Sequence, residues 1–131
     1  MRILLEKEAL SHCVSNHSIP SEELLGCIEQ MRFYTENGND DWDAYLQADI
    51  AFHSSVMKAA DNVYIWKCWK LIESQYKMAM YRMRSVYPQA FLGTGEEHKK
   101  IYEQLLFGNQ EPWIQHLENL KSDVDMIIHS L

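Results

Sequence analysis

The sequence predicts an all-α fold, an antiparallel helical bundle of about six helices, and three observations support this prediction. Apolar residues recur at helical intervals along most of the chain. The 131 residues include only 5 glycines and 3 prolines, far fewer turn signals than a sandwich or barrel of many short strands needs. The expected connections are short beside the helices, which favours antiparallel neighbours in a bundle.

The first two helices are predicted from apolar spacing and from polar residues at their ends. The first covers the start of the chain and fades near Asn16. Ser18 or Ser21, on either side of Pro20, caps the second, which ends at Asn37-Gly38-Asn39. The apolar positions are Ile3, Leu4, Ala9, Leu10 and Val14 in the first and Leu24, Leu25, Ile28, Met31 and Tyr34 in the second.

The next two helices are expected over 41–60 and 63–87. The first turn of 41–60 is rich in Asp, which suits the positive end of a helix dipole, and Asp61-Asn62 forms a break and cap. Residues 63–87 are apolar on more than one face, so we expect this helix to be the central and most buried one. Its apolar residues include Trp66, Trp69, Leu71, Ile72, Tyr76, Met78, Met80, Tyr81 and Met83.

Two shorter helices complete the expected bundle. Pro88 and Gly93 to Gly95 interrupt the apolar pattern, and Thr94-Gly-Glu-Glu97 has the form of a capping box. The fifth helix then runs to Phe107 and stops at Gly108. Pro112 lies in the first turn of the sixth, whose apolar stripe is Trp113, Leu117, Leu120, Val124 and Ile128.

Composition places bounds on partners and compartment. The length fits one domain, and 47% hydrophobic with 24% charged residues is typical of a folded globular protein. A net charge of −7 without a Lys/Arg-rich stripe argues against DNA binding by this segment alone. Three cysteines without a Cys-x-x-Cys pair fit reduced, mostly core thiols. With no signal peptide and no apolar run of membrane-spanning length, we expect a cytoplasmic protein that does not enter a membrane.

The most suggestive local pattern is Asp49-Ile-Ala-Phe52-His53. Its carboxylate and imidazole are four residues apart, so they project from the same helix face and could hold one metal ion. A mild intrahelical contact is the alternative. Phe52 and Val56 flank the pair, which implies that this face turns inward, where a buried Asp needs a partner.

Other polar residues have both a functional and a structural interpretation. His98 opens the fifth helix and could be a solvated helix-start residue; His116 lies on the sixth between Trp113 and Leu117. Arg82 and Arg84 could clamp a carboxylate ligand or extend to solvent. The sequence has no Glu-x-x-His pair, His-Glu-x-x-His, Gly-x-Ser-x-Gly or phosphate loop, so no recognised catalytic motif is present.

Four segments, in their order and intervals, resemble the FCD domain, the effector-binding carboxy-terminal half of FadR-subfamily regulators in the GntR superfamily. They are Arg2-Ile-Leu-Leu-Glu6, Asp49-Ile-Ala-Phe52-His53 with the following Ala59 to Asn62, Glu96-Glu97-His98-Lys-Lys-Ile101, and Gly108-Asn109. The resemblance covers nearly all of the chain and implies one effector-binding and dimerisation domain over 1–131. The winged-helix DNA-binding half is expected to lie outside this chain.

The resemblance also implies a ligand set. Family members hold a divalent metal, often zinc or nickel, with one Asp and three His residues, and small carboxylic acids bind over it. Asp49, His53 and His98 match three of these ligands. Counting from Gly108, the fourth falls at Asn119, and His116, one helical turn earlier, is the other candidate.

Three states of this site remain open on the sequence. In the first, the ion has three protein ligands plus water or effector. In the second, His116 or Asn119 completes the ligand set. In the third, the cavity is metal-free. For the effector carboxylate we assign Arg82, with Arg84 and Arg2 as further candidates.

The expected function is therefore sensing of a small organic acid by a homodimer that controls DNA binding through the winged-helix half. The domain is not expected to be an enzyme. The alternatives are a metal-free dimerisation module and a metal-dependent hydrolase-like enzyme, for which Glu97 is the only base to propose.

Overall fold

The computed structural model describes residues 2–35, 41–86 and 95–130, and describes side chains for 2–34, 41–85 and 95–122. In these ranges the chain forms six helices and no strand, so the all-α prediction is confirmed. The helices are α1 (Arg2–Ser15), α2 (Ser21–Thr35), α3 (Trp42–Ala59), α4 (Val63–Val86), α5 (Gly95–Leu106) and α6 (Glu111–Ser130).

Each predicted helix is present, with ends that shift by a few residues. Asp41 caps α3 by accepting a hydrogen bond from the backbone N–H of Ala44 at 3.1 Å. Asn62 caps α4, because its Oδ1 accepts from the N–H of Tyr64 at 2.9 Å. Gly108, at φ +80°, ends α5 in the left-handed conformation that glycine adopts without strain. The predicted signals at Asn37-Gly38-Asn39, Pro88 and Thr94 lie outside the described residues.

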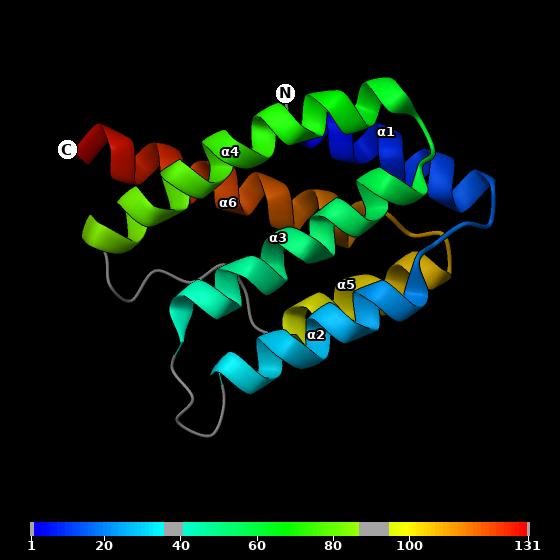
Figure 1. Ribbon diagram of the computed structural model, residues 1–131, viewed down its shortest axis with the longest axis horizontal. Helices are drawn as coiled ribbons and strands as arrows, with labels where there is room; N and C mark the ends of the chain where they lie inside the picture. Colours follow the sequence, from blue (N-terminus) through cyan, green and yellow to red (C-terminus); the bar gives the residue numbers. More distant parts are fainter. Residues whose placement is uncertain (1, 36–40, 87–94, 131) are drawn as a thin grey trace.

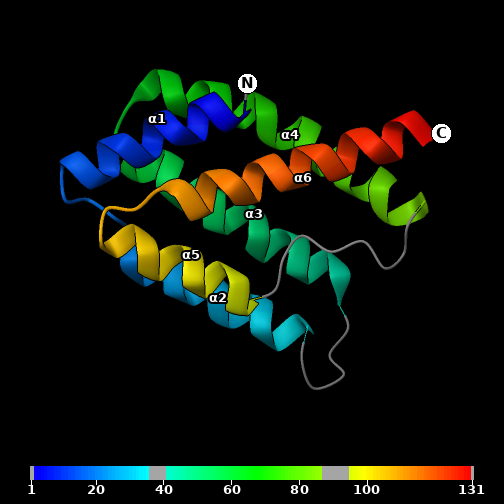
Figure 2. The same ribbon diagram turned by 180° about the vertical axis from the view of Figure 1, so that it is seen from behind.

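Helix α3 is the centre of the bundle. Figure 1 shows it running between α4 on one side and the α2–α5 pair on the other, and α3 contacts α1, α2 and α4. Seen from behind in Figure 2, α6 crosses the molecule between α1 and α5, and it contacts both of them. The buried residues of α3 are Tyr45, Leu46, Ala48, Asp49, Ile50, Phe52, His53, Val56 and Met57.

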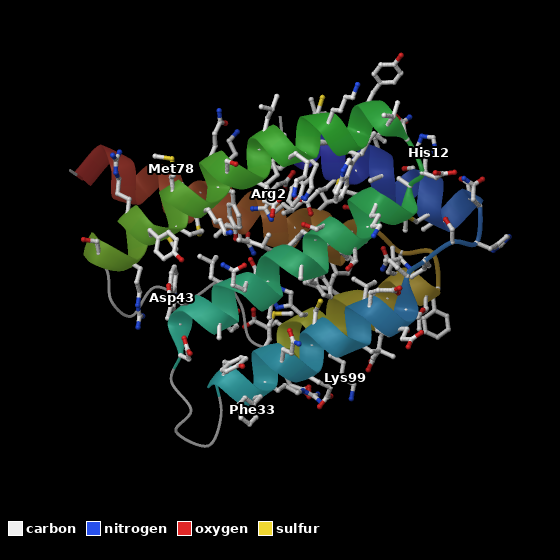
Figure 3. The ribbon with its side chains drawn as sticks, in the orientation of Figure 1. Arg2, His12, Phe33, Asp43, Met78 and Lys99 are labelled. Carbon is white, nitrogen blue, oxygen red and sulfur yellow. The ribbon has the colours of Figure 1, made fainter. Side chains whose placement is uncertain are left out.

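The prediction that α4 is the most buried helix is wrong. Trp69, Tyr76, Met80 and others face the core, but Leu71 is 72% exposed. Met78, which projects from the outer side of α4 in Figure 3, is 73% exposed. One of the apolar faces of α4 is therefore not covered by the rest of the described chain.

The pairing of α2 with α5 depends on one glycine. A Cβ on Gly95 would lie 2.5 Å from Cγ of Arg32, 3.1 Å from its backbone N and 3.2 Å from the carbonyl oxygen of Ile28. Only a residue without a side chain allows this approach. Arg32 also pairs with Glu96 across the same contact, with Nη2 2.9 Å from Oε2. Gly95 therefore allows the first turn of α5 to lie against α2, three residues before His98.

Two smaller expectations concern cysteines and membranes. Cys13 and Cys27 are buried as free thiols, in line with core positions, whereas Cys68 is exposed. Among the described residues, no helix combines the length and apolar character needed to cross a bilayer.

Candidate metal centre

Four side chains from three helices meet inside the bundle. Asp49 and His53 come from α3, His98 from α5 and His116 from α6, and one ligand atom from each lies within 4.8 Å of the other three. Asp49 and His98 are 0% exposed and His53 is 1% exposed. The solvated helix-start interpretation of His98 is therefore excluded, and the inward face proposed for Asp49 and His53 is present.

Asp49 is the centre of this cluster. Its Oδ1 lies 3.0 Å from Nε2 of His98 and 3.6 Å from Nε2 of His53. Its Oδ2 accepts a 2.8 Å hydrogen bond from the hydroxyl of Tyr76 on α4. Burial alone would raise the pKa of Asp49, but the adjacent imidazoles of His53 and His98 outweigh it and hold that pKa well below its usual range. Asp49 is thus a buried carboxylate, the form that binds a cation.

Two imidazole nitrogens in the cluster have no hydrogen-bond partner. They are Nε2 of His53 and Nε2 of His116, both buried. Buried polar atoms are nearly always satisfied, so each such atom calls for an explanation. Burial, together with the neighbouring His53 and His98, lowers the pKa of His116 to about 3, so its ring is neutral at physiological pH. An unprotonated nitrogen of a neutral imidazole can coordinate a metal ion.

The donor set fits a first-row transition ion. Imidazole and carboxylate together suit borderline metals such as zinc and nickel. Ligand atoms around such an ion sit about 2.0–2.2 Å from it, hence roughly 3–4 Å from one another. The separations within the cluster exceed this only slightly, so an ion would need small side-chain movements and no change in the helices.

Glu6 on α1 is a second buried carboxylate directly behind the cluster. Its Oε1 accepts from Nε1 of Trp113 on α6 at 3.1 Å and lies 2.5 Å from Nδ1 of His53. Its Oε2 lies 2.6 Å from Nε of Arg2, one turn earlier on the same helix. Burial would raise the pKa of Glu6, but the charges of His53 and Arg2 lower it to about 2.

Arg2 brings a guanidinium into the same region. Its Cζ lies 3.9 Å from the centre of the Tyr76 ring, a cation–π contact, and its side chain is only 15% exposed. Figure 3 shows Arg2 within the bundle rather than on its rim. Its Nη2 is buried without a hydrogen-bond partner. The guanidinium therefore has an unused donor near the ligand cluster.

The remaining sequence candidates lie elsewhere. Asn119 is exposed on α6, where its Oδ1 accepts from Nε2 of Gln115 at 2.9 Å, and the structure brings His116 rather than Asn119 into the cluster. Arg82 is exposed, and Arg84 lies with its Cζ 5.5 Å from the centre of the Trp42 ring. Of the three arginines, Arg2 is the one in contact with residues around the cluster.

Three residues around the cluster were not assigned a role from the sequence: Glu6, Tyr76 and Trp113. The sequence predicts Tyr76 and Trp113 only as core residues on apolar helix faces. Glu6 did carry a signal, because it shares a helix face with the buried Ala9, Leu10 and Cys13. A charged residue on an apolar helix face is the pattern that marks a buried, partnered carboxylate.

A helical bundle with an internal Asp and three His residues is the arrangement that the resemblance to the FCD domain implies, and comparison with known families agrees. The sequence model of the FCD domain matches residues 1–119. The chain belongs to the FCD family, the regulatory domains of GntR-type transcription regulators, which confirms the resemblance seen in the sequence.

One curated relative is 27% identical over 111 residues and is described as "Probable D-xylose utilization operon transcriptional repressor" from Paenarthrobacter nicotinovorans. The match covers 85% of this chain and 47% of the relative, so the chain spans about half of that protein's length. No solved structure matches the chain significantly. Family and relative both indicate a domain of a transcription regulator rather than an enzyme.

Proposed function

We propose that this domain senses a small organic acid, which binds over a divalent metal ion held by Asp49, His53, His98 and His116. The observation that carries the proposal is the pair of buried, unpartnered nitrogens, Nε2 of His53 and Nε2 of His116, beside the ionised Asp49. A purely structural cluster would leave both nitrogens unsatisfied, at a cost of about 1–3 kcal/mol each. A bound cation satisfies both.

The chain's own residues supply the other parts of the site. Asp49 contributes negative charge, and Tyr76 orients it through the hydrogen bond to Oδ2. Arg2 offers Nη2 to an anion, because its Nε is already taken by Glu6. A zinc or nickel ion in this place would supply a Lewis-acidic position for one carboxylate oxygen of the effector. We therefore assign the effector carboxylate to Arg2 in preference to Arg82 or Arg84.

Sensing requires a second conformational state. A ligand shifts an equilibrium only by binding one arrangement better than the other. We infer that the domain works as a homodimer in the cytoplasm and passes this difference to a winged-helix DNA-binding half of the regulator. The relative's description as a transcriptional repressor and its greater length support this inference.

The direct test measures metal and ligand binding together. The purified domain is depleted with a chelator, titrated with Zn²⁺ and separately with Ni²⁺, and then screened by thermal shift against a panel of mono- and dicarboxylic acids. We expect one ion per chain and a further rise in Tm with at least one acid, since ligands that bind only the folded state stabilise it by mass action. His53→Ala, His98→Ala and His116→Ala should lose zinc, whereas His12→Ala, on a half-exposed position of α1, should retain it. A folded wild type that binds no zinc or nickel would refute the proposal.

A further inference from the structure

Glu6 is the one buried carboxylate of the described interior that lies outside the proposed ligand set. It receives three hydrogen-bond donors from three different helices: Arg2 on its own helix α1, His53 on α3 and Trp113 on α6. Two of these partners belong to, or lie beside, the proposed metal and effector site. The number and direction of these contacts suggest a role beyond filling space in the core.

The contact with His53 determines which ring nitrogen is available to an ion. Trp113 Nε1 can only donate, and the Arg2 guanidinium pairs with Oε2 as a cation with a carboxylate, so Oε1 is an acceptor for both of its neighbours. The nitrogen of His53 that faces Oε1, Nδ1, is therefore the protonated one. A neutral His53 must then carry its lone pair on Nε2, the nitrogen that faces Asp49 and has no other partner.

The contact between Glu6 and Arg2 orients the guanidinium that we assign to the effector carboxylate. Oε2 of Glu6 holds Nε of Arg2 at 2.6 Å, and the ring of Tyr76 supports the guanidinium from one face. These two contacts fix the plane of the guanidinium, so the free Nη2 has a defined direction. One carboxylate thus orients a candidate metal ligand with one oxygen and a candidate anion-binding group with the other.

We propose that Glu6 is the positioning residue of this site: it holds His53 with Nε2 directed at the metal ion and holds Arg2 ready for the effector carboxylate. This inference rests on the proposed function. Outer-shell carboxylates of this kind fix the tautomer and the orientation of a ligating His and raise its basicity. Because Trp113 shares Oε1, the same residue also fixes α6, the helix that carries His116, against α1.

Two variants of Glu6 separate the proposal from a merely structural role. Glu6→Gln keeps an acceptor oxygen for His53 and Trp113 but places an amide N–H group opposite Nε of Arg2, where two donors face each other. Glu6→Leu removes every acceptor. Glu8→Gln is the matched control, because Glu8 lies on the same helix with its side chain 65% exposed.

Zinc affinity, measured by competition with a chromophoric chelator, is the first measurement. We expect Glu6→Leu to bind Zn²⁺ about 10–100-fold more weakly than the wild type, the usual loss for an outer-shell partner, and Glu6→Gln to stay within about fivefold. Glu8→Gln should match the wild type. Circular dichroism and thermal melts establish that each variant is folded.

Imidazole and guanidinium N–H signals in ¹⁵N-labelled, zinc-loaded protein are the second measurement. The wild type should show a slowly exchanging Nδ1–H of His53 and a protected Nε–H of Arg2. Glu6→Gln should keep the first signal and lose the second. This measurement also tests whether Glu6 positions His53 and Arg2 if Glu6→Leu fails to fold.

The outcomes distinguish this inference from the proposed function. A wild type that binds no metal overturns both. A folded Glu6→Leu with wild-type zinc affinity, or a zinc-loaded wild type in which Nδ1 of His53 is the ligating nitrogen, overturns the role of Glu6 and leaves the metal site standing. Loss of zinc binding in Glu6→Gln equal to that in Glu6→Leu likewise overturns the tautomer argument.

Discussion

The hydroxyl of Tyr76 on α4 donates a 2.8 Å hydrogen bond to Oδ2 of Asp49 on α3. This contact joins α4 to the carboxylate at the centre of the cluster. It also explains why the pKa of Tyr76 is well above its ordinary value, since burial and the adjacent Asp49 both disfavour a phenolate. Tyr76 therefore stays a donor over the whole physiological pH range.

Tyr76→Phe removes only this hydroxyl. Because a hydrogen bond to a buried charged group contributes about 1.5–3 kcal/mol, the metal-free protein should lose free energy of unfolding of that order, measured by urea denaturation. Zinc affinity should fall several-fold as Asp49 loses its orientation. A variant with wild-type stability would contradict the assigned contribution of this hydrogen bond.

Gly95→Ala tests the close contact between α2 and α5. The new Cβ would meet backbone atoms of α2 at 3.1 and 3.2 Å, and these cannot move as a side chain could. We expect a loss of about 1–3 kcal/mol in stability, as for overpacked cores, and weaker zinc binding because His98 moves with α5.

Gly26→Ala is the control for that substitution. Gly26 lies on an exposed position of α2 with nothing within 4 Å of its Cβ direction. Alanine there should stabilise the helix by up to about 1 kcal/mol and leave zinc affinity unchanged. Equal effects of the two substitutions on zinc affinity would contradict the assigned role of Gly95.

Acidification should destabilise the metal-free domain in two stages. His116, with a pKa lowered from 6.5 to about 3, binds its proton more readily when unfolded, so stability is lost as pH falls below about 6.5. Glu6, lowered from 4.5 to about 2, and Asp49 add losses below about pH 4.5. One such group gives a slope of at most about 1.4 kcal/mol per pH unit.

His53 acts in the opposite direction at higher pH. Burial lowers its pKa but the charge of Glu6 more than compensates, so the folded-state pKa is raised and its contribution is lost as pH rises through that value. Stability should thus be greatest near neutral pH. Denaturation of His116→Leu from pH 7 to 5 should show a shallower slope than the wild type; an unchanged slope would mean that His116 does not titrate as described.

Arg2→Met should separate anion binding from metal binding. The variant loses the guanidinium beside Tyr76 but keeps all four proposed ligands, so zinc affinity should change little. The Tm increase caused by carboxylic acids should disappear. Arg82→Met, on the exposed surface of α4, is the matched control and should respond like the wild type. The reverse pattern would return the effector carboxylate to Arg82.

The sequence predicted the helices well because their signals are local. Asp41, Asn62 and Gly108 act on their own chain neighbours, so caps and stops can be identified without the fold. The burial of α4 was predicted wrongly because burial depends on packing between helices and not on local signals. Apolar residues such as Leu71 and Met78 look alike whether the bundle covers them or not, and only packing decides.

The candidate site was predictable in part. Asp49 and His53 share a helix, so their proximity follows from spacing alone. His98 entered only through the family resemblance, since nothing local links it to α3. Counting along the chain pointed to Asn119 for the fourth position, but the rotation and depth of α6 in the bundle bring His116 there. Glu6 was missed as a partner because two of its three donors, His53 and Trp113, come from distant parts of the sequence.

The four proposed ligands are drawn from positions 49, 53, 98 and 116, so an extended chain offers no comparable coordination sphere. An ion bound there would cross-link α3, α5 and α6, so metal binding would add to the free energy of unfolding. If the domain has the proposed function, a shortage of that metal would lower the stability of the folded domain and with it the amount that can bind the effector.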